Sequence, residues 1–419
     1  MKPPFPATTH AHVHAILLVL DFGEGQLESR IVEARELVTT AGATVAACLT
    51  GKRHKPDAAT FAGSGKVDEL KLLIEEFAAT LVVVDHRLSP IQIRNLENAL
   101  GQDKVRVMDR TDLILEIFGQ RARSAEGKLQ VELAQMQHLL TRLVKGWTHL
   151  ERQRGGIGVR GGPGETQLEI DRRLVGERIK KLKARLLKLE KQRTTQRQGR
   201  QRAGTFTVSI VGYTNAGKST LFNRLTRADS YVADKLFATL DTTTRRFFLA
   251  PAYNIALSDT VGFIRELPHS LIAAFHATLT EALEADVLLH VIDASNPACD
   301  NQIEDVQKVL VEIGADHIPQ IRVFNKIDRL EHRSSHAMAT VMREEDGKIC
   351  EIRLSAESGE GIELLRQALA EYAASSLPLL HPAEAFSEPC REPSSEPSNR
   401  EISLANKSNA EANHLEESW

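Results

Sequence analysis

The sequence predicts an α/β fold in which two α/β regions flank a helical hairpin. Three observations predict it. Buried-strand patterns alternate with helical patterns in residues 1–122, apolar residues recur every seven positions in residues 123–202, and the strand and helix alternation resumes at Phe206. The 419 residues are 42% hydrophobic and carry a formal net charge of −3, so the chain is long enough for two or three domains that each bury a core.

Residues 1–122 are predicted to form a small N-terminal domain with a mainly parallel sheet. The apolar runs HAILLVLDF, ATVAACLT, TLVVVDH and VRVMD are typical of buried strands. Between them, GQLESRIVEARELVTTAG, GSGKVDELKLLIEEFAA and SPIQIRNLENALG carry apolar residues at helical spacing. This alternation favours parallel strands, because each helix returns the chain to the same end of the sheet.

Residues 123–202 are predicted to form an antiparallel helical hairpin that resembles a coiled coil. One seam consists of Leu129, Leu133, Met136, Leu140, Leu143, Trp147 and Leu150, and the other of Leu168, Val175, Ile179, Leu182, Leu186 and Leu189. Thr166 and Glu169 fit a capping box that starts the second helix. Between the helices, six of the ten residues 155–164 are glycine. Ordering glycine costs conformational entropy, so we expect this tip to become ordered on a partner.

The charge is distributed unevenly along the chain. Residues 142–202 contain 18 Lys and Arg against 6 Asp and Glu, a local charge of 18 − 6 = +12. Residues 381–419 contain 3 against 8, which gives −5. The basic segment indicates a nucleic-acid partner, with a solvated helix face as the alternative. The acidic tail, residues 379–419, is rich in Pro, Ser, Glu and Asn and is predicted to be disordered.

A phosphate-binding loop follows the hairpin. FTVSIVGYTNAGKSTLFNRL begins at Phe206 and places G-x-x-x-x-G-K-S between a strand and a helix. In such a loop the backbone N–H groups surround the β-phosphate, the lysine, here Lys218, offsets phosphate charge, and the hydroxyl, here Ser219, binds Mg²⁺. Residues 203–378 are therefore predicted to form a P-loop domain that binds a nucleoside triphosphate with Mg²⁺.

Two further motifs complete the nucleotide site, and the second of them selects guanine. Asp259 and Gly262 form D-x-x-G, in which the carboxylate holds Mg²⁺ through water and the glycine N–H senses the γ-phosphate. Asn325 to Asp328 form N-K-x-D. The Asp328 carboxylate can accept two N–H groups of guanine, where adenine presents a lone pair. In LSAES, Ser355 and Ala356 are expected to reach the guanine O6, so the four elements together predict a GTPase.

The loop between these motifs is the switch I candidate, DKLFATLDTTTRR. Thr239 is the predicted γ-phosphate-sensing ligand of Mg²⁺, and Thr243 is the alternative. Phe263 stands where many GTPases place a glutamine that orients water, so slow hydrolysis is expected from the protein alone.

The predicted site residues fall into three groups. Lys218 and Gly262 are predicted to act in catalysis, and Ser219 and Thr239 to bind the metal. Nucleotide contacts are predicted for Gly212, Tyr213, Thr214, Asn215, Ala216, Gly217, Lys218, Ser219, Thr220, Phe237, Ala238, Thr239, Leu240, Asp241, Asp259, Thr260, Val261, Gly262, Asn325, Lys326, Ile327, Asp328, Ser355, Ala356 and Glu357.

FAGSGKVDEL is a second, weaker phosphate-loop candidate. Thr60 stands at the position of the first P-loop glycine and Val67 replaces the metal-binding hydroxyl, so the segment is predicted to start a helix, with a weak nucleotide site as the alternative. HAHVH is assigned to surface histidines, His10, His12 and His14. The cysteines, Cys48, Cys299, Cys350 and Cys390, lack metal-ligand spacing and are expected to be thiols.

These motifs resemble one family closely. RLVKGWTHLERQRGGIGVRGGPGETQLEIDRR, SIVGYTNAGKSTLFNRL, FATLDTTTR, DTVGFI and NKID are similar to the HflX family of ribosome-associated GTPases, over roughly residues 12 to 375. The resemblance implies an N-terminal α/β domain and a helical hairpin before the GTPase domain. It also implies binding to the large ribosomal subunit and its RNA, splitting of stalled ribosomes, and a tip that probes RNA.

The expected function is a GTPase that binds the large ribosomal subunit and dissociates or remodels stalled ribosomes. The alternatives are an RNA-stimulated ATPase or helicase-like factor with a second nucleotide site in residues 1–122, and a GTP-dependent ribosome-binding module without splitting activity. No apolar run reaches the roughly 18 residues that a membrane span requires. We therefore expect a cytoplasmic protein. We also expect it to be a monomer.

Overall fold

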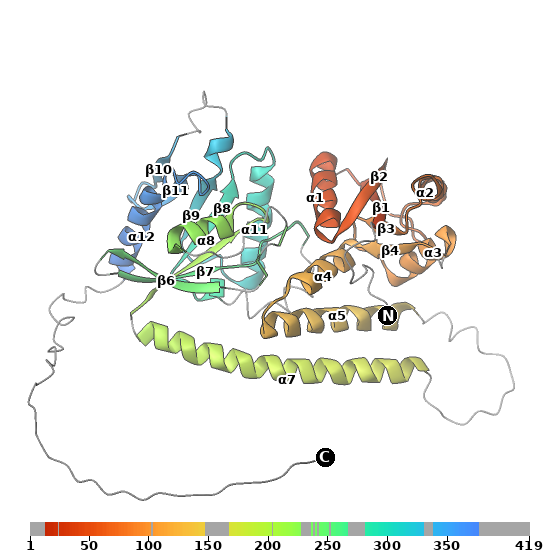
Figure 1. The fold of residues 1–419 in the computed structure, drawn as a ribbon, viewed down its shortest axis with the longest axis horizontal. Coiled ribbons are helices and arrows are strands. Elements are labelled where there is room, and N and C mark those ends of the chain that lie inside the picture. Colours follow the sequence, from red (N-terminus) through yellow and green to blue (C-terminus); the bar gives the residue numbers. More distant parts are fainter. Residues whose placement is uncertain are drawn as a thin grey trace, which may run out of the picture. The chain divides into compact units, whose positions relative to one another are not determined.

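A computed structural model of the chain describes residues 13–23, 25–101, 104–146, 167–202, 204–227, 236–237, 239–240, 243–250, 253–266, 281–330 and 338–376. Within this part, the elements fall into an N-terminal α/β region, two long helices and a second α/β region (Figure 1). The predicted fold class is confirmed. The predicted tip lies outside the described residues, as do Thr166, Trp147, His10, His12, Cys390 and the acidic tail. The boundaries given to the four domains stay a prediction.

The N-terminal region holds a four-stranded sheet of order β2-β1-β3-β4, and all its strand pairs are parallel as predicted. Its strands are β1 (Val13–Asp21), β2 (Ala43–Lys52), β3 (Leu81–Val84) and β4 (Arg106–Asp109). Its helices are α1 (Leu27–Thr40), α2 (Ser64–Phe77), α3 (Pro90–Leu100) and α4 (Arg110–Arg121). Helix α4 is an addition to the sequence prediction.

Side chains of β1 alternate between two cores, which is why its sequence reads as one continuous apolar run. Leu17 and Val19 pack in a cluster with α1 and α4, whereas Leu18 and Leu20 pack in a cluster with α2 and α3. His14, near the start of β1, is exposed.

Two helices pair to form the hairpin, α5 (Ala125–Gly146) and α7 (Gln167–Arg202). Leu133, Ile179 and Leu182 are buried between them. Glu126 of α5 pairs with Arg193 of α7 at 2.9 Å, and the Glu132 carboxylate accepts from Arg178. Residues later in α5 thus contact residues earlier in α7, as in an antiparallel pair. The predicted antiparallel arrangement and apolar seam are therefore present in the described part of both helices.

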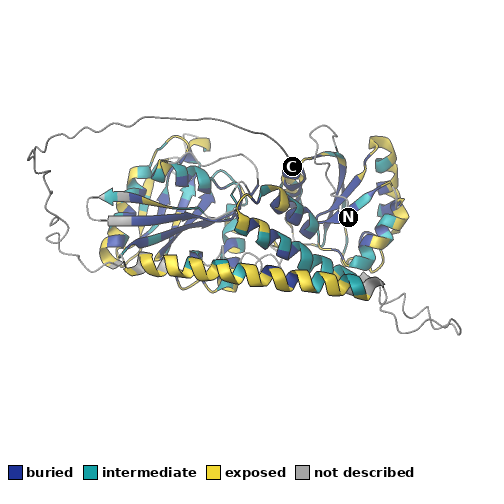
Figure 2. Ribbon diagram, turned by 60° about the horizontal axis from the view of Figure 1, so that its bottom comes forward, coloured by how far each residue is buried: buried dark blue, intermediate teal, exposed yellow. Residues whose placement is uncertain are grey.

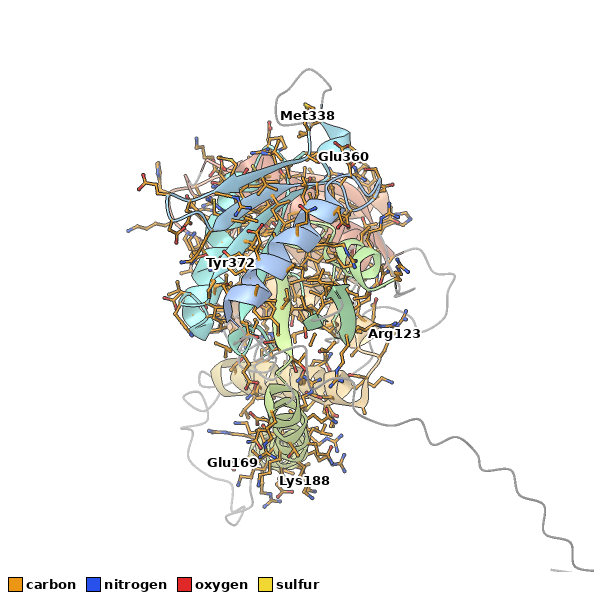
Figure 3. All side chains as sticks on the ribbon, turned by 90° about the vertical axis from the view of Figure 1, so that its left-hand side faces the viewer. Arg123, Glu169, Lys188, Met338, Glu360 and Tyr372 are labelled. Atoms are coloured by element: carbon orange, nitrogen blue, oxygen red, sulfur yellow. The ribbon has the colours of Figure 1, made fainter. Side chains whose placement is uncertain are left out.

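The outer face of α7 is exposed along the length of the helix (Figure 2). Charged side chains such as Lys188 stand out from it, as the view along the helix shows (Figure 3). No described helix is long and apolar enough to span a membrane.

The second α/β region holds a seven-stranded sheet of order β10-β11-β9-β8-β5-β7-β6. The central strands pair in parallel, and β6 and β10 add antiparallel edges. Its strands are β5 (Phe206–Gly212), β6 (Thr243–Ala250), β7 (Tyr253–Asp259), β8 (Val287–Asp293), β9 (Gln320–Asn325), β10 (Thr340–Arg343) and β11 (Ile349–Arg353). Helices α8 (Lys218–Thr226), α11 (Cys299–Ile313) and α12 (Ile362–Ser376) pack with them, and a 3-10 turn spans Ile327–Arg329. The carboxyl ends of β5, β7, β8 and β9 meet at one edge, where open α/β sheets bind ligands.

Candidate nucleotide-binding site

The P-loop lies between β5 and α8, as predicted. Gly212 and Gly217 have φ of 145° and 90°, values that side chains with a Cβ rarely adopt. A Cβ on Gly212 would collide with the Val291 carbonyl, and a Cβ on Gly217 would collide with the Asn325 amide. The two glycines therefore allow the loop to pack against β8 and β9.

Lys218 is 6% exposed and lies at the start of α8. Its Nζ donates to the Tyr213 carbonyl oxygen at 2.6 Å. Burial lowers the pKa of Lys218 to about 8, against the attraction of the nearby Asp259 carboxylate. The ammonium is thus fixed in place in a partly dehydrated setting, where an added phosphate would interact with it strongly.

Three oxygens converge beside this lysine. Ser219 Oγ lies 2.6 Å from Thr239 Oγ1 and donates to Asp259 Oδ2 at 2.8 Å, and Thr239 Oγ1 donates to the same oxygen at 3.0 Å. Burial raises the pKa of Asp259 above its usual range. Asp259 Oδ1 is buried and has no hydrogen-bond partner among the described residues. A cluster of hard oxygen ligands with an unsatisfied carboxylate fits Mg²⁺.

The structure separates the two switch I threonines. Thr243 is the first residue of β6 and pairs with Asp259 across the antiparallel ladder. Thr239 is the threonine whose hydroxyl reaches Ser219. The geometry therefore favours Thr239 over Thr243 as a metal ligand, although the role itself stays a prediction.

The N-K-x-D segment connects the end of β9 to the P-loop. Asn325 donates to the Ala216 carbonyl at 2.9 Å and accepts from the Ala356 N–H at 2.8 Å. Lys326 donates to the Asn215 carbonyl at 2.7 Å and pairs with Asp293 at 2.7 Å. Asp328 is exposed and lines the cavity. Asn325 and Lys326 thus hold the loop in shape, and the Asp328 carboxylate remains accessible to a base.

A cavity of about 410 Å³ joins the phosphate end to the Asp328 end. It is lined by predicted residues from all the motifs, namely Thr214, Asn215, Gly217, Lys218, Ser219, Thr220, Phe237, Thr239, Thr260, Gly262, Asn325, Lys326, Asp328, Ala356 and Glu357. Other predicted residues lie outside the lining, namely Gly212, Tyr213, Ala216, Leu240, Asp259, Val261, Ile327 and Ser355. Ala238 and Asp241 lie outside the described residues.

Ser355 and Ala356, the residues expected to reach guanine O6, each form a hydrogen bond with another protein group. Ser355 is fully buried, and its hydroxyl accepts from the Ser358 N–H at 3.1 Å. The Ala356 N–H donates to Asn325. Arg329 also lines the cavity. It was not predicted from the sequence, because the N-K-x-D motif does not specify the residue that follows it.

Gly262 lies against the P-loop. A Cβ placed on it would come within 2.9 Å of Lys218 Nζ and 2.8 Å of Thr214 Cγ2, so glycine is required at this approach. The next residue, Phe263, is 1% exposed and packs in a hydrophobic cluster. Its backbone N–H donates to the Gly212 carbonyl at 3.0 Å, and its carbonyl accepts from Thr214 at 2.7 Å. The Phe263 ring is therefore buried in the core and offers no polar group to a water.

Comparison with known proteins agrees with this geometry. Family descriptions match three consecutive parts of the chain: "GTP-binding GTPase N-terminal" over residues 28–119, "GTP-binding GTPase Middle Region" over 121–200, and "50S ribosome-binding GTPase" over 207–326. The GTPase HflX of Escherichia coli (strain K12) is 52% identical over 357 residues, which cover 85% of this chain and 82% of that protein. The chain belongs to the HflX family. The resemblance drawn from the sequence is thereby confirmed.

A second member of the HflX family has a similar level of identity. The GTPase HflX of Magnetococcus marinus is 53% identical over 333 residues, which cover 80% of this chain and 75% of that protein. A solved structure described as the SsGBP and GDP complex is 25% identical, with a TM-score of 0.48, over 87% of this chain and 99% of that one. That TM-score is too low to add to the assignment. This HflX-family protein is a GTPase, and GTP is its substrate.

Proposed function

We propose that this GTPase binds the large ribosomal subunit and uses GTP binding and hydrolysis to dissociate or remodel stalled ribosomes. The observation that carries the proposal is the exposed basic face of α7 in the same chain as the GTP site. Arg172, Arg173, Lys180 and Lys181 are all exposed on this helix. Such a face attracts RNA phosphate without regard to sequence. The "50S ribosome-binding GTPase" description over residues 207–326 supports the same partner.

In this proposal Ser219 and Thr239 hold Mg²⁺, with Asp259 behind them. The ion would offset negative charge on the β- and γ-phosphates. Lys218 contributes a fixed positive charge to the same phosphates, the Gly262 N–H contacts the γ-phosphate, and Asp328 selects guanine. The protein would act in the cytoplasm, where ribosomes translate.

Sucrose-gradient profiles of ribosomes, with and without GTP, test the proposal. Replacing residues 155–164 by a short Gly-Ser turn should leave GTP affinity intact and ribosome binding only modestly weaker, while it abolishes subunit separation. Wild-type separation by this variant would contradict a role for the glycine-rich tip. Ribosome binding without separation by the unaltered protein would instead favour a GTP-dependent binding module.

A matched variant isolates the contribution of the basic face. Neutralising Arg172, Arg173, Lys180 and Lys181 should weaken ribosome binding and flatten its salt dependence, by about 0.7 to 0.9 in log–log slope for each phosphate group that the helix no longer neutralises. An unchanged slope would show that α7 does not face RNA phosphate.

Hydrolysis by the protein alone should be slow. Because Phe263 is buried and offers no group to orient water, we expect turnover well below about 1 s⁻¹, the low end of ordinary enzyme rates. Purified large subunits should raise the rate by completing the site. A rate that large subunits leave unchanged would contradict this explanation.

A further inference from the structure

A side chain of the N-terminal region reaches the peptide backbone three residues after Gly262. The Arg265 N–H donates to the Tyr213 hydroxyl at 2.9 Å, and the Arg265 carbonyl accepts from the Arg110 guanidinium at 3.1 Å. Both polar groups of this peptide segment are therefore held by side chains. Arg110 is the first residue of α4, whereas Tyr213 belongs to the P-loop.

Glu33 of α1 joins these two side chains. One of its carboxylate oxygens accepts from the Tyr213 hydroxyl and the other pairs with Arg110. The Tyr213 hydroxyl thus accepts from Arg265 and donates to Glu33, which satisfies it on both sides. The triad of Glu33, Arg110 and Tyr213 is hereafter called the switch clamp.

Further ion pairs in the N-terminal region hold Arg110 of the switch clamp in place. Arg110 also pairs with Asp85, which accepts from Arg30 Nε at 3.2 Å. Arg30 in turn reaches Glu266 at 3.3 Å. Arg110, Arg30 and Asp85 are each at most 5% exposed. Ions this deeply buried are costly to leave unpaired, so the network resists the opening of any one ion pair.

The held segment is the one that must respond to the γ-phosphate. Arg265 lies three residues after Gly262. Between them, the Phe263 backbone forms hydrogen bonds with the P-loop residues Gly212 and Thr214. In this arrangement Gly262 lies beside Lys218, and Thr239 lies beside Ser219. Lys218, Thr239 and Gly262 thus line the same cavity, at the position expected for the γ-phosphate. Tyr213 lies outside the cavity lining, so direct contact with the nucleotide does not explain it.

We propose that Glu33 and Arg110, through Tyr213 and the backbone of Arg265, are positioning residues that hold Gly262 in the arrangement that binds the γ-phosphate. The contact with the N-terminal region then strengthens binding of the γ-phosphate, and the bound γ-phosphate stabilises this contact, because binding couplings are reciprocal. The proposal requires GTP binding and does not require subunit separation, so the gradient experiments and the one below can fail independently.

Tyr213→Phe tests the clamp, since the ring stays and both hydroxyl hydrogen bonds disappear. Affinity for a non-hydrolysable GTP analogue should fall about tenfold, which corresponds to about 1.4 kcal/mol, while GDP affinity changes less than about twofold. Tyr372→Phe is the matched control. Tyr372 lies on helix α12, away from the clamp, and its hydroxyl donates to the Ile349 carbonyl on β11 (Figure 3). Equal losses for both nucleotides, or no loss for either, would overturn the proposal.

Glu33 provides a second, milder test that stands if the tyrosine variant fails to fold. Glu33→Gln keeps an acceptor for the Tyr213 hydroxyl and should lower the ratio of analogue to GDP affinity less than Glu33→Ala does. Combining Glu33→Ala with Tyr213→Phe should add little to either single change, because both remove the same link. Fully additive effects, or equal ratios for the Gln and Ala variants, would contradict the link.

Discussion

Two described helices of this protein begin at a segment of glycine, serine and lysine, and the surroundings of the two segments differ. Helix α2 follows Gly63 in GSGK, and α8 follows Gly217 in GKS. Lys66 of α2 pairs with Glu69 of its own helix at 2.7 Å, and the place of a Gly63 Cβ is taken by the Arg53 guanidinium. Lys218 is buried beside Asp259 and Gly262.

The difference lies in what the neighbouring strands supply. At α8, β7 contributes Asp259 to the serine hydroxyl and β9 contributes Asn325 to the loop backbone. At α2 the corresponding position of the hydroxyl is Val67, which is buried in the apolar core. A helix N-terminus attracts anions, but coordination of a nucleotide with Mg²⁺ needs ligands from strands far away in sequence.

Exchanging each lysine for alanine should give the largest contrast. Lys218→Ala removes a buried ammonium from the phosphate position and should lower GTP turnover by at least about 100-fold, as expected when a charge is removed from a dehydrated site. Lys66→Ala should leave turnover and nucleotide binding unchanged. Loss of ATP or GTP binding in Lys66→Ala, measured by fluorescence titration of the full chain, would support a second nucleotide site.

Asp328→Asn sharpens the comparison at the base end of the cavity, where Asp328 is exposed and accessible to a base. The amide cannot accept two guanine N–H groups, so GTP affinity should fall by about 100-fold and xanthine nucleotides should become preferred. Competition between GTP and xanthosine triphosphate measures the preference. A persistent guanine preference would exclude Asp328 as the base-reading residue.

The smallest effect concerns one histidine in each region, the half-buried His86 and the buried His290. Burial lowers the pKa of His86 and of His290 to about 4. A histidine with a lowered folded pKa is protonated more readily in the unfolded state, so stability falls as the pH drops from about 6.5 towards 4. For His290, about 2 kcal/mol should be lost between pH 7.5 and pH 5. His290→Leu should show a smaller acid drop in melting temperature, and an equal drop would contradict this assignment.

Much of this fold follows from local sequence. The central strands of both sheets are buried on two faces and read as continuous apolar runs, and the P-loop, D-x-x-G and N-K-x-D motifs are each contiguous. The structure adds α4, whose N-cap Asp109 also ends the strand VRVMD and so hid the start of the helix. It also adds two edge strands, β6, which begins with the polar residues TTRR, and β10, whose residues TVMR lack the apolar run of a central strand.

The switch clamp illustrates why the remaining features were not predictable. Glu33 and Tyr213 lie 180 positions apart in the chain, and neither stands out within its own segment. Glu33 occupies an ordinary position of an amphipathic helix, and Tyr213 occupies a P-loop position at which the motif accepts any residue. Only the folded arrangement of α1, α4 and the P-loop brings them together.

Helix α7 ends at Arg202, four positions before β5 begins at Phe206, and β5 ends at the P-loop. The 36 residues of α7 form a lever arm about 54 Å long at 1.5 Å per residue. A rotation of about 5° about its C-terminal end would move its other end by about 5 Å, which is one helical turn. A rotation too small to disturb the packing around β5 would therefore be amplified to the size of a nucleotide at the far end of the arm.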